Sequence, residues 1–320
     1  MVQNRQRALV PPEGGPVGEA SAGAIVAERV AHETSRLLAG RLEPGLYLVA
    51  TPIGNLADIT LRALAVLARA DVVYCEDTRH SRTLLSRYGI GRSLRAYHEH
   101  NAERERPRIL SSLAAHCSIA IISDAGTPLI SDPGFKLVRA VLAAGHRVIN
   151  IPGPSAALAA LTSTGLPSDC FLFAGFLPAK QSARRARLTE IKAVPATLIL
   201  FEAPSRLAGS LADMAEILGA RSAAIARELT KVHEEVHRGT LADLAVWAAG
   251  SAVRGEVAVV VAPPPTAEIT DAAIATELMT RMTTMSVRDA AKAVAEALGV
   301  PRGRVYDIAV GMKRGGASFG

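Results

Sequence analysis

Several short segments of this sequence combine glycine and proline with hydrogen-bonding side chains, a composition that suits ligand binding. They are TPIGN (51–55), EDTRH (76–80), SDAGTPLISDPG (123–134), PGPSA (152–156), FEAPSR (201–206), ARELTK (226–231) and RGE (254–256). Ligands of parallel α/β sheets bind just beyond the carboxyl ends of the strands, where small residues let them approach the backbone. Ordinary turn chemistry explains any one segment, but turns alone would also gather at the opposite edge of a sheet. The set therefore predicts a shaped ligand cleft.

Apolar runs that alternate with helical patterns must position these segments. The apolar runs predict strands at 46–50, 72–75, 119–123 and 147–151. Apolar residues at helical spacing predict helices at 60–69, through 84–88, at 134–144 and at 156–162. This alternation indicates an α/β fold with a mostly parallel sheet covered by helices on both faces.

A second α/β domain is expected from about residue 165. Its expected elements are strands at 197–201, 223–226 and 256–262 and a helix at 205–218. A triple proline at 263–265 marks a linker, and only helices are expected beyond it, including 287–298 and 305–313. We therefore predict four parts: a disordered or loosely helical extension (1–44), an N-terminal α/β domain (45–164), a C-terminal α/β domain (165–264) and a small helical tail (265–320).

The amino-terminal extension is expected to lie outside the fold. Prolines and glycines between residues 11 and 18 argue against regular structure there. Residues 25–38 favour a helix, but this helix has little to pack against.

Composition limits the class of partner and the compartment. The formal net charge of +6 permits an anionic partner such as a nucleic acid, without proving one. Aromatic residues make up 4% of the chain, which argues against a protein that grips single strands mainly by base stacking. The three cysteines are far apart, which argues against disulfides and a zinc site, so we expect no metal. We see no signal peptide and no apolar run near the ~20 residues that span a bilayer, so we expect a cytoplasmic protein without membrane contact.

Common nucleotide-binding and hydrolase signatures are missing. There is no GxxxxGK[ST] segment for triphosphate hydrolysis and no GxGxxG after the first expected strand for a dinucleotide. A GxSxG elbow is missing too.

Longer motifs, in a fixed order, carry a family resemblance. They are LYLVATPIGNLADITLRAL (46–64), CEDTRHSRTLL (75–85), HEHN (98–101), SDAGTPLISDPG, PGPSAALAAL (152–161), GLPSD (165–169), GFLPAK (175–180) and ARELTK. With these motifs the chain from Gly45 to Ala262 resembles the tetrapyrrole methylase superfamily, whose class III methyltransferases bind S-adenosylmethionine in a cleft between two α/β domains. Within it, the sequence is similar to the enzymes that methylate a cytidine 2′-hydroxyl of 16S ribosomal RNA. The resemblance implies transfer to cytidine 1402 in the small ribosomal subunit and a homodimer.

The resemblance also implies which residues bind S-adenosylmethionine. These are Pro52, Gly54, Asp124, Ala125, Gly126, Thr127, Ser155, Ala156, Phe201, Glu202, Ala203, Arg227 and Glu256. Asp124 would pair with the amino group of the cofactor, or else it only caps its turn. The helix that starts at Ala156 offers free N–H donors to a carboxylate. Phe201 is equally explained as a core residue.

The general base stays unassigned. A ribose 2′-hydroxyl is a weak acid, so a nearby base would help to remove its proton. The candidates in the motifs are His98, His100, Asp77, Glu76 and Asp124. Histidine is the side chain whose unperturbed pKa lies nearest neutrality, which favours His100 as the base, but a structural or RNA-contacting histidine explains it as well.

Basic residues near the motifs are expected to contact RNA phosphates. They are Arg79, His80 and Arg82 in one strip, Lys180, Arg184, Arg185 and Arg187 in a second, and Arg206 and Lys231 in a third. The alternative for the second strip is a solvated helix face. Position 205 is serine where the family commonly has histidine, so no catalytic role is carried over there.

Two other functions stay open at this point. A tetrapyrrole methylase would use the same fold on a small molecule, and a non-catalytic RNA-binding protein would keep the fold without the cofactor.

Overall fold

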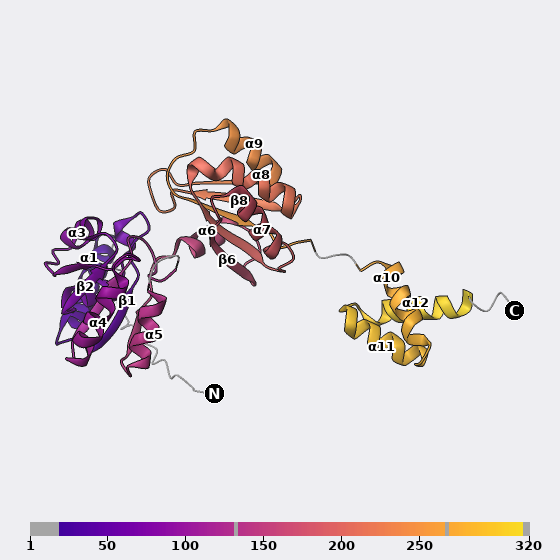
Figure 1. Ribbon diagram of the computed structural model, residues 1–320, viewed down its shortest axis with the longest axis horizontal. Helices are drawn as coiled ribbons and strands as arrows, with labels where there is room; N and C mark the ends of the chain where they lie inside the picture. Colours follow the sequence, from indigo (N-terminus) through magenta and orange to yellow (C-terminus); the bar gives the residue numbers. More distant parts are fainter. Residues whose placement is uncertain (1–18, 131–133, 266–268, 316–320) are drawn as a thin grey trace. The chain divides into compact units, whose positions relative to one another are not determined.

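The computed structural model describes residues 19–130, 134–265 and 269–315, and the chain divides into two units at Pro264 and Pro265. The first unit contains two β-sheets, and the described part of the second is helical (Figure 1). The glycine- and proline-rich stretch at 11–18 and residues 131–133 of the predicted ligand loop lie outside the described residues.

The first sheet is parallel throughout, with the strand order β3-β2-β4-β1-β5. Its strands are β1 (Gly45–Val49), β2 (Val72–Cys75), β3 (Leu94–Ala96), β4 (Ser118–Ile122) and β5 (Val148–Ile151). The helices of this region are the 3-10 helix η1 (Leu56–Asp58), α2 (Leu61–Arg69), α3 (Thr78–Arg87), α4 (Ala102–Ala114) and α5 (Phe135–Ala143).

Alternate residues of β1 enter two different cores, one on each face of the first sheet. Tyr47 and Val49 pack with residues of α2 and α3. Leu46 packs with residues of α4 and α5 on the opposite face. Because side chains alternate along a strand, the nearly continuous apolar runs of this sheet bury both faces. The predicted covering on both faces is confirmed for the first sheet.

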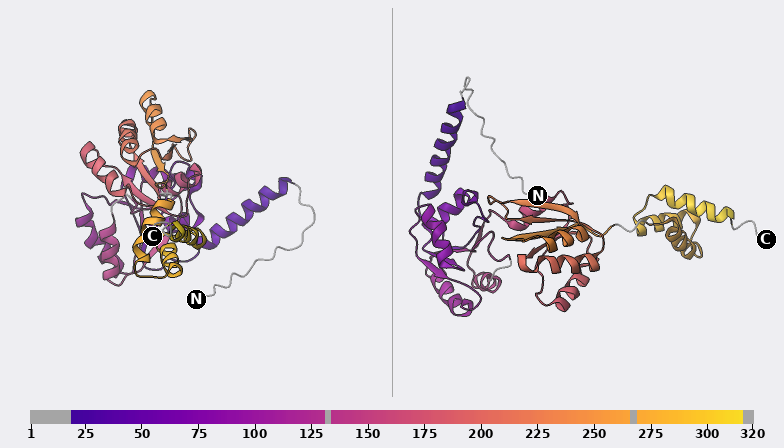
Figure 2. Two further views of the ribbon diagram at one scale, coloured as in Figure 1. Left: turned by 90° about the vertical axis from the view of Figure 1, so that its right-hand side faces the viewer. Right: turned by 90° about the horizontal axis from the view of Figure 1, so that it is seen from above.

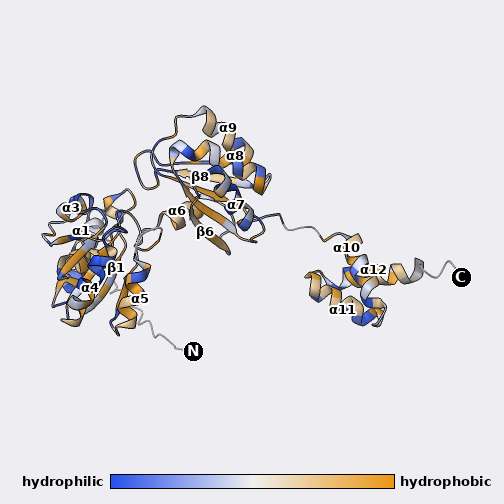
Figure 3. Cartoon of the chain, in the orientation of Figure 1, coloured by the Kyte–Doolittle hydropathy of each residue, from blue (hydrophilic) through white to orange (hydrophobic). Residues whose placement is uncertain are grey.

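The second sheet is mixed, with the order β6-β7-β10-β8-β9. Its strands are β6 (Phe171–Phe176), β7 (Thr197–Glu202), β8 (Ser222–Arg227), β9 (Glu235–Thr240) and β10 (Val257–Val261). Only β6 and β7 pair in parallel, whereas β10 is antiparallel to both β7 and β8, and β9 is antiparallel to β8. The edge strands β6 and β9 were not predicted from the sequence. β9 is half-exposed and has no continuous apolar run, whereas β6 is apolar but stands where the chain was expected to enter the second domain. Figure 3 shows hydrophobic residues along the strands of this sheet.

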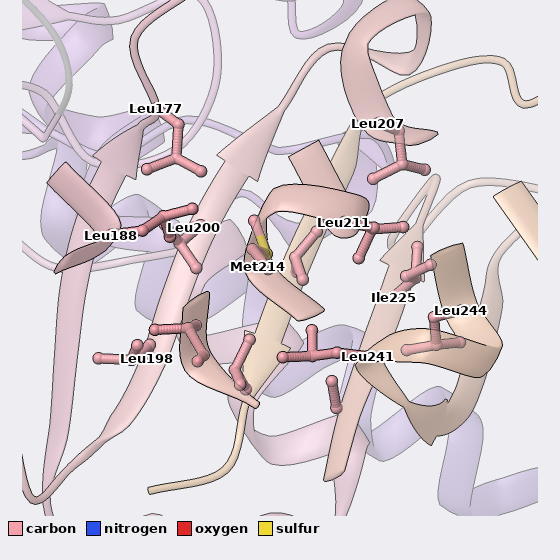
Figure 4. Packing of buried hydrophobic residues seen from close by; sticks show 14 of the residues in the cluster. Leu177, Leu188, Leu198, Leu200, Leu207, Leu211, Met214, Ile225, Leu241 and Leu244 are labelled. Carbon is pink, nitrogen blue, oxygen red and sulfur yellow. The ribbon is translucent and has the colours of Figure 1, made fainter. Parts of the chain in front are cut away.

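Three helices cover one face of the second sheet. They are α7 (Gln181–Ile191), α8 (Leu207–Leu218), which follows the 3-10 helix η2 (Pro204–Arg206), and α9 (Leu241–Gly250). Figure 4 shows how leucines of these helices meet Leu198 and Leu200 of β7 and Ile225 of β8. Thr240 and Asp243 form a capping box that fixes the start of α9.

The other face of the second sheet is covered by α6 (Ala156–Thr164), which follows β5 of the first sheet along the chain. Ala157, Ala160 and Leu161 pack against buried residues of β7, β8 and β10. The predicted boundary at residue 164 assigns α6 to the first α/β domain, whereas its apolar contacts are with the second sheet.

The amino-terminal extension contains one long helix, α1 (Glu19–Leu38), which Figure 2 shows as unbroken. Its carboxyl end is fixed to α2, because the guanidinium of Arg69 donates to the carbonyl oxygens of Leu37 and Gly40 over 2.6 and 3.0 Å. Regular structure therefore extends further toward the amino terminus than the predicted helix at 25–38.

The second unit contains α10 (Asp271–Met282), α11 (Val287–Leu298) and α12 (Arg302–Gly315). These helices enclose their own core, which includes Ile274, Leu278, Val294 and Val305. None of the helices in the described part of the chain has the length and apolarity needed to cross a bilayer.

Candidate functional site

A cavity of about 390 Å³ lies where loops from both sheets of the first unit meet. Most of the residues predicted to bind the cofactor line it: Asp124, Ala125, Gly126, Thr127, Ser155, Ala156, Phe201, Glu202, Ala203 and Glu256. Residues 123–127 follow β4 and residues 155–156 follow β5. Residues 201–203 lie at the end of β7, and residue 256 comes directly before β10, both in the region of the second sheet.

Backbone hydrogen bonds hold the loop that follows β4. Thr51 and Gly126 form an isolated β-bridge, in which each backbone N–H donates to the carbonyl oxygen of the other over 2.9 and 3.1 Å. The hydroxyl of Ser123 also donates to the carbonyl oxygen of Gly126. Gly126 has φ = 77°, in the left-handed region that favours glycine. The loop therefore presents its backbone at the cavity wall in one defined conformation.

Asp124 lines the cavity and also joins two strand ends. Its Oδ1 accepts a hydrogen bond of 3.1 Å from the backbone N–H of Asp77, which follows β2. Its Oδ2 accepts no hydrogen bond from the residues that the structure describes. The same carboxylate can therefore brace the loop and bind a cation.

The amino end of α6 also faces the cavity. Ser155 is the N-cap, and its hydroxyl accepts from the N–H of Leu158. The first N–H groups of a helix have no partner within it, and the helix dipole places positive charge at this end. This part of the wall favours a negatively charged group.

The second sheet contributes an aromatic and mostly apolar wall. The ring of Phe201 makes edge contacts with Phe173 and Phe176, with centroids 4.9 and 5.6 Å apart. Phe201 is half-buried against the apolar cluster beneath α6, so it has a core role as well as a place in the cavity. The carboxylate of Glu202 is buried and occupied by Arg206 and Ser210.

The antiparallel direction of β10 explains why residues before this strand reach the cavity. Val257, its first residue, pairs with Glu202 at the end of β7 and with Arg227 at the end of β8. Gly255 has φ = 83°, and a Cβ atom there would overlap the carboxylate of Glu228. Only glycine fits at this close approach.

Three residues predicted to bind the cofactor do not line the cavity. Pro52 is buried. Gly54 lies at a contact between loops, because a Cβ there would come within 2.9 Å of the carbonyl oxygen of Leu229. Arg227 pairs with Glu235 over 3.1 Å and donates to the carbonyl oxygen of Arg254, so protein groups occupy its guanidinium.

The candidate bases lie outside the cavity lining, with the exception of Asp124. Asp77 is the N-cap of α3, and hydrogen bonds from the side chain and backbone of Arg79 lower its pKa to about 2, which makes it a weak base. The rings of His98 and His100 are 5.9 Å apart. His98 is half-buried and its Nδ1 has no hydrogen-bond partner, whereas His100 and Glu76 are exposed.

Several predicted RNA-contacting cations are instead paired with carboxylates. Arg184 is buried and lies 2.6 Å from Asp213, so its guanidinium is not free to meet a phosphate in this structure. The remaining pairs are Arg185 with Asp213 and Glu216, Arg187 with Glu190, Arg206 with Glu202, and Lys231 with Glu228 and Glu256. Sequence spacing did not reveal the pairs with Asp213, Glu216 and Glu256, because these carboxylates stand 25 or more residues from their partners along the chain. Glu190, Glu202 and Glu228 stand three or four residues from theirs.

Four predicted RNA contacts remain exposed. Arg79 pairs with Asp77 but its side chain is 88% exposed, and His80 and Arg82 are exposed on α3. Lys180 is exposed just before α7. No group of acidic, histidine and cysteine side chains in the described ranges is arranged to hold a metal ion.

Sequence reasoning missed part of the cavity wall. Ile53, Ile130, Phe176, Pro204, Ala226, Leu229, Gly255, Val257 and Ala258 also line it. Seven of these nine residues stand inside the motifs given above, so the motifs were a usable signal. The exceptions are Val257 and Ala258, which look like ordinary residues of the apolar strand β10.

A family model described as Tetrapyrrole (Corrin/Porphyrin) Methylases matches residues 45–245. The chain belongs to this family. A second model, described as RsmI C-terminal HTH domain, matches residues 268–313. The predicted family is therefore confirmed, and so is the predicted α/β fold class.

Curated relatives within the tetrapyrrole methylase family are similar over most of their length. A protein of Mesorhizobium japonicum named "Ribosomal RNA small subunit methyltransferase I" is 62% identical over 69% of this chain and 76% of its own. Proteins with the same name from Xylella fastidiosa strain Temecula1 and Pseudomonas aeruginosa are 48% and 47% identical, over 82% and 83% of this chain and 98% and 96% of theirs.

Solved structures share the fold at low identity. A cobalt precorrin-4 methyltransferase of cobalamin biosynthesis superposes with a TM-score of 0.53 at 16% identity, over 68% of this chain and 94% of its own. A protein from Aeropyrum pernix has a TM-score of 0.55 at 20% identity, over 86% of this chain and 98% of its own. These likenesses concern the fold alone.

The pair of Arg184 and Asp213 makes a stability prediction. Arg184→Ala should lower the free energy of unfolding by about 3–5 kcal/mol, because it leaves the Asp213 carboxylate buried with fewer partners. Urea unfolding followed by the fluorescence of Trp247, the sole tryptophan, reports on this core. Arg187→Ala, which breaks an exposed pair, should cost no more than about 1 kcal/mol.

The pair of Arg184 and Asp213 also predicts how the stability of the fold depends on pH. Burial raises the pKa of Asp213, but hydrogen bonds from Gln181, Arg184 and Arg185 outweigh it and hold the pKa below its ordinary value. Because the pKa of Asp213 is lowered on folding, its ionised carboxylate stabilises the folded protein at pH values above the unfolded pKa of ~3.9. This stabilisation is lost as the pH falls below that value. The difference in the free energy of unfolding between Arg184→Ala and the parent should therefore shrink in that acidic range. Equal stability of the two proteins at neutral pH would contradict the pairing.

Proposed function

We propose that this chain transfers a methyl group from S-adenosylmethionine to the 2′-hydroxyl of cytidine 1402 in 16S ribosomal RNA, by direct in-line transfer. The observation that carries the proposal is the cavity between the two sheets, in a chain whose curated relatives are named as small-subunit rRNA methyltransferases. We further propose that it acts in the cytoplasm as a homodimer on the small subunit, without a metal ion.

The cavity wall fits the chemical parts of S-adenosylmethionine. Its volume of about 390 Å³ lies in the ordinary range for a pocket that holds a small ligand. Asp124 would pair with the ammonium group, and the amino end of α6 would receive the carboxylate. Phe201 and Ala203 would contact the adenosine part, beside an apolar wall that includes Ala226 and Val257. The groups proposed for the ammonium and carboxylate thus come from the loop after β4 and the start of α6, while the apolar contacts proposed for the adenosine part come from the second sheet.

Positioning should account for most of the catalysis. When bound, S-adenosylmethionine supplies an electrophilic methyl group on a sulfonium that leaves readily. The chain has to align the ribose oxygen with this methyl group, and such alignment contributes up to ~7–11 kcal/mol in the best cases. The braced loop at 123–127 and the capped start of α6 are rigid elements suited to this task.

His100 is the base that we propose. Asp77 has a pKa of about 2, so it accepts a proton poorly near neutrality. Histidine is the side chain that most often serves as a general base in enzymes, through a ring nitrogen of its neutral imidazole. His100 is exposed to an incoming substrate, whereas His98 is half-buried.

The exposed cations are proposed to hold the RNA. Arg79, His80 and Arg82 on α3 and Lys180 before α7 are exposed and can meet phosphates, although Arg79 also pairs with Asp77. Arg185 and Arg187 are only partly exposed and keep their carboxylate partners. The two alternatives, a tetrapyrrole methylase and a non-catalytic RNA-binding protein, are less well supported. Relatives at 47–62% identity are named as rRNA methyltransferases.

Methyl transfer to purified ribosomal subunits tests the function. With labelled S-adenosylmethionine, the chain should methylate small subunits from cells lacking this protein, and mass spectrometry of nuclease fragments should place the methyl group on the ribose of the expected cytidine. Large subunits and a free precorrin serve as controls and should take up no label. Label on the precorrin alone would overturn the proposal in favour of a small-molecule methylase.

The methyl-transfer rates of two variants test the base. His100→Gln should lower kcat by about 10²–10⁴-fold, because it removes the side chain that is proposed to accept the proton. Asp77→Asn should lower kcat much less, since a carboxyl with a pKa of about 2 accepts a proton poorly. A kcat of His100→Gln equal to that of the parent would assign the proton to another group.

A further inference from the structure

A second hollow lies beside the edge strand of the first sheet, away from the cofactor cavity. It measures about 420 Å³ and is lined by Arg95, Ala96, Asn101, Arg104, Glu105 and Arg108. Arg95 and Ala96 belong to β3, and Arg104, Glu105 and Arg108 belong to α4. We call it the arginine hollow.

A buried carboxylate orients two of the three arginines. The side chain of Glu105 is 6% exposed, and its Oε1 accepts hydrogen bonds from Arg104 over 3.2 Å and from Arg108 over 2.8 Å. Both guanidinium groups remain largely exposed, at 70% and 60% of their side-chain surface. Since a guanidinium carries five N–H donors, most donors of Arg104 and Arg108 are free for a ligand.

The charges of the arginine hollow favour an anion. Arg95 pairs with no carboxylate among the residues that the structure describes. Three positive charges therefore surround one buried negative charge. The fork of guanidinium donors matches the oxygens of a phosphate, which can accept two parallel hydrogen bonds.

The arginine hollow begins at the same sheet edge as the cofactor cavity. The strands β3, β2 and β4 are parallel, so their carboxyl ends lie along one edge. Asn101 ties the loop after β3 to this edge, because its side chain accepts from the N–H of His98 and donates to the carbonyl oxygen of Ala96, each over 2.9 Å. The HEHN segment, with the proposed base His100, lies between the end of β3 and α4.

The strand order places the positive groups in a line. The order is β3-β2-β4-β1-β5. The cavity loops follow β4 and β5, the exposed Arg79, His80 and Arg82 follow β2, and the arginine hollow lies beside β3. A chain of phosphates leaving the cavity along this edge would meet α3 first and the hollow next.

We propose that the arginine hollow binds a backbone phosphate of the RNA strand that carries the reacting nucleotide. The proposal rests on the proposed function and adds a direction to it: the strand runs from the cofactor cavity across α3 to β3 and α4. The ligand is a phosphodiester, held by Arg95, Arg104 and Arg108, with Glu105 as a positioning residue.

Binding of an RNA fragment that spans the expected cytidine tests the hollow. Arg95→Ala breaks no ion pair, and Arg108→Ala removes a guanidinium that Glu105 orients. Each variant should bind the fragment about fivefold more weakly near 0.1 M salt and should reduce the slope of log K against log salt by about 0.7, the contribution of one phosphate contact on a single strand.

Arg36→Ala is the matched control. Arg36 pairs with Glu33 three positions away, as Arg108 pairs with Glu105, and its side chain is 64% exposed. It lies on α1, outside the residues that match the methylase family. This variant should keep the parent's RNA affinity and salt slope, and thermal unfolding should show all three variants folded.

The outcomes separate this inference from the proposed function. Calorimetry with S-adenosylmethionine should give parental affinity for all variants, and absence of binding to the parent itself would overturn the proposed function whatever the RNA result. If Arg95→Ala and Arg108→Ala bound RNA with the affinity and salt slope of Arg36→Ala, the proposed phosphate binding at the arginine hollow would be overturned, and the proposed function would stand. Inorganic phosphate at constant ionic strength should compete no better than chloride; selective competition in the parent but not in the variants would assign the hollow to free phosphate instead.

Discussion

The packing of α6 on the second sheet is the contact on which the candidate site depends. Its chain enters from β5 of the first sheet, yet Ala157, Ala160 and Leu161 are buried against the strands of the second. Alanines let the helix approach the sheet closely, and burial of this apolar surface fixes it there. The start of α6 thereby lies at the edge of the second sheet, so that loops after β4 and β5 share one cavity with Phe201 and Ala203. Without this contact, the two sets of loops would face solvent separately.

Electrostatics divides the basic residues of the first unit into two classes. Arg184, Arg206 and Lys231 are held by carboxylates and fix α7, η2 and the loop after β8. Their charges are largely compensated within the protein. The cations after β2 and beside β3, at the same sheet edge as the cavity, stay largely exposed even where a carboxylate pairs with them, as in Arg79, Arg104 and Arg108. A formal net charge of +6 therefore says less about partners than the place of these exposed groups.

Local sequence signals predicted the loops of the site because glycine, proline and caps act over a few residues. Gly126 and Ser155 belong to this class, and each has the backbone role that its motif suggests. Contacts between distant segments were not predictable in this way. Arg184 was predicted to contact a phosphate because its partner, Asp213, stands 29 residues away along the chain, on α8. The edge strand β9 was not predicted because it is half-exposed and has no apolar run. The direction of β10, which brings Glu256 to the cavity, is likewise a property of the sheet and not of the local sequence.

Calorimetric titration with S-adenosylmethionine of variants from both sides of the cavity tests the central claim most directly. Asp124→Asn changes the first-sheet wall and keeps the shape of the side chain, while Ala203→Phe fills space at the second-sheet wall. Both should weaken binding by at least about tenfold, which corresponds to about 1.4 kcal/mol. Asp71→Asn, at the opposite edge of the first sheet, should bind as the parent does. Parental affinity in either cavity variant would contradict a single site built from both sheets.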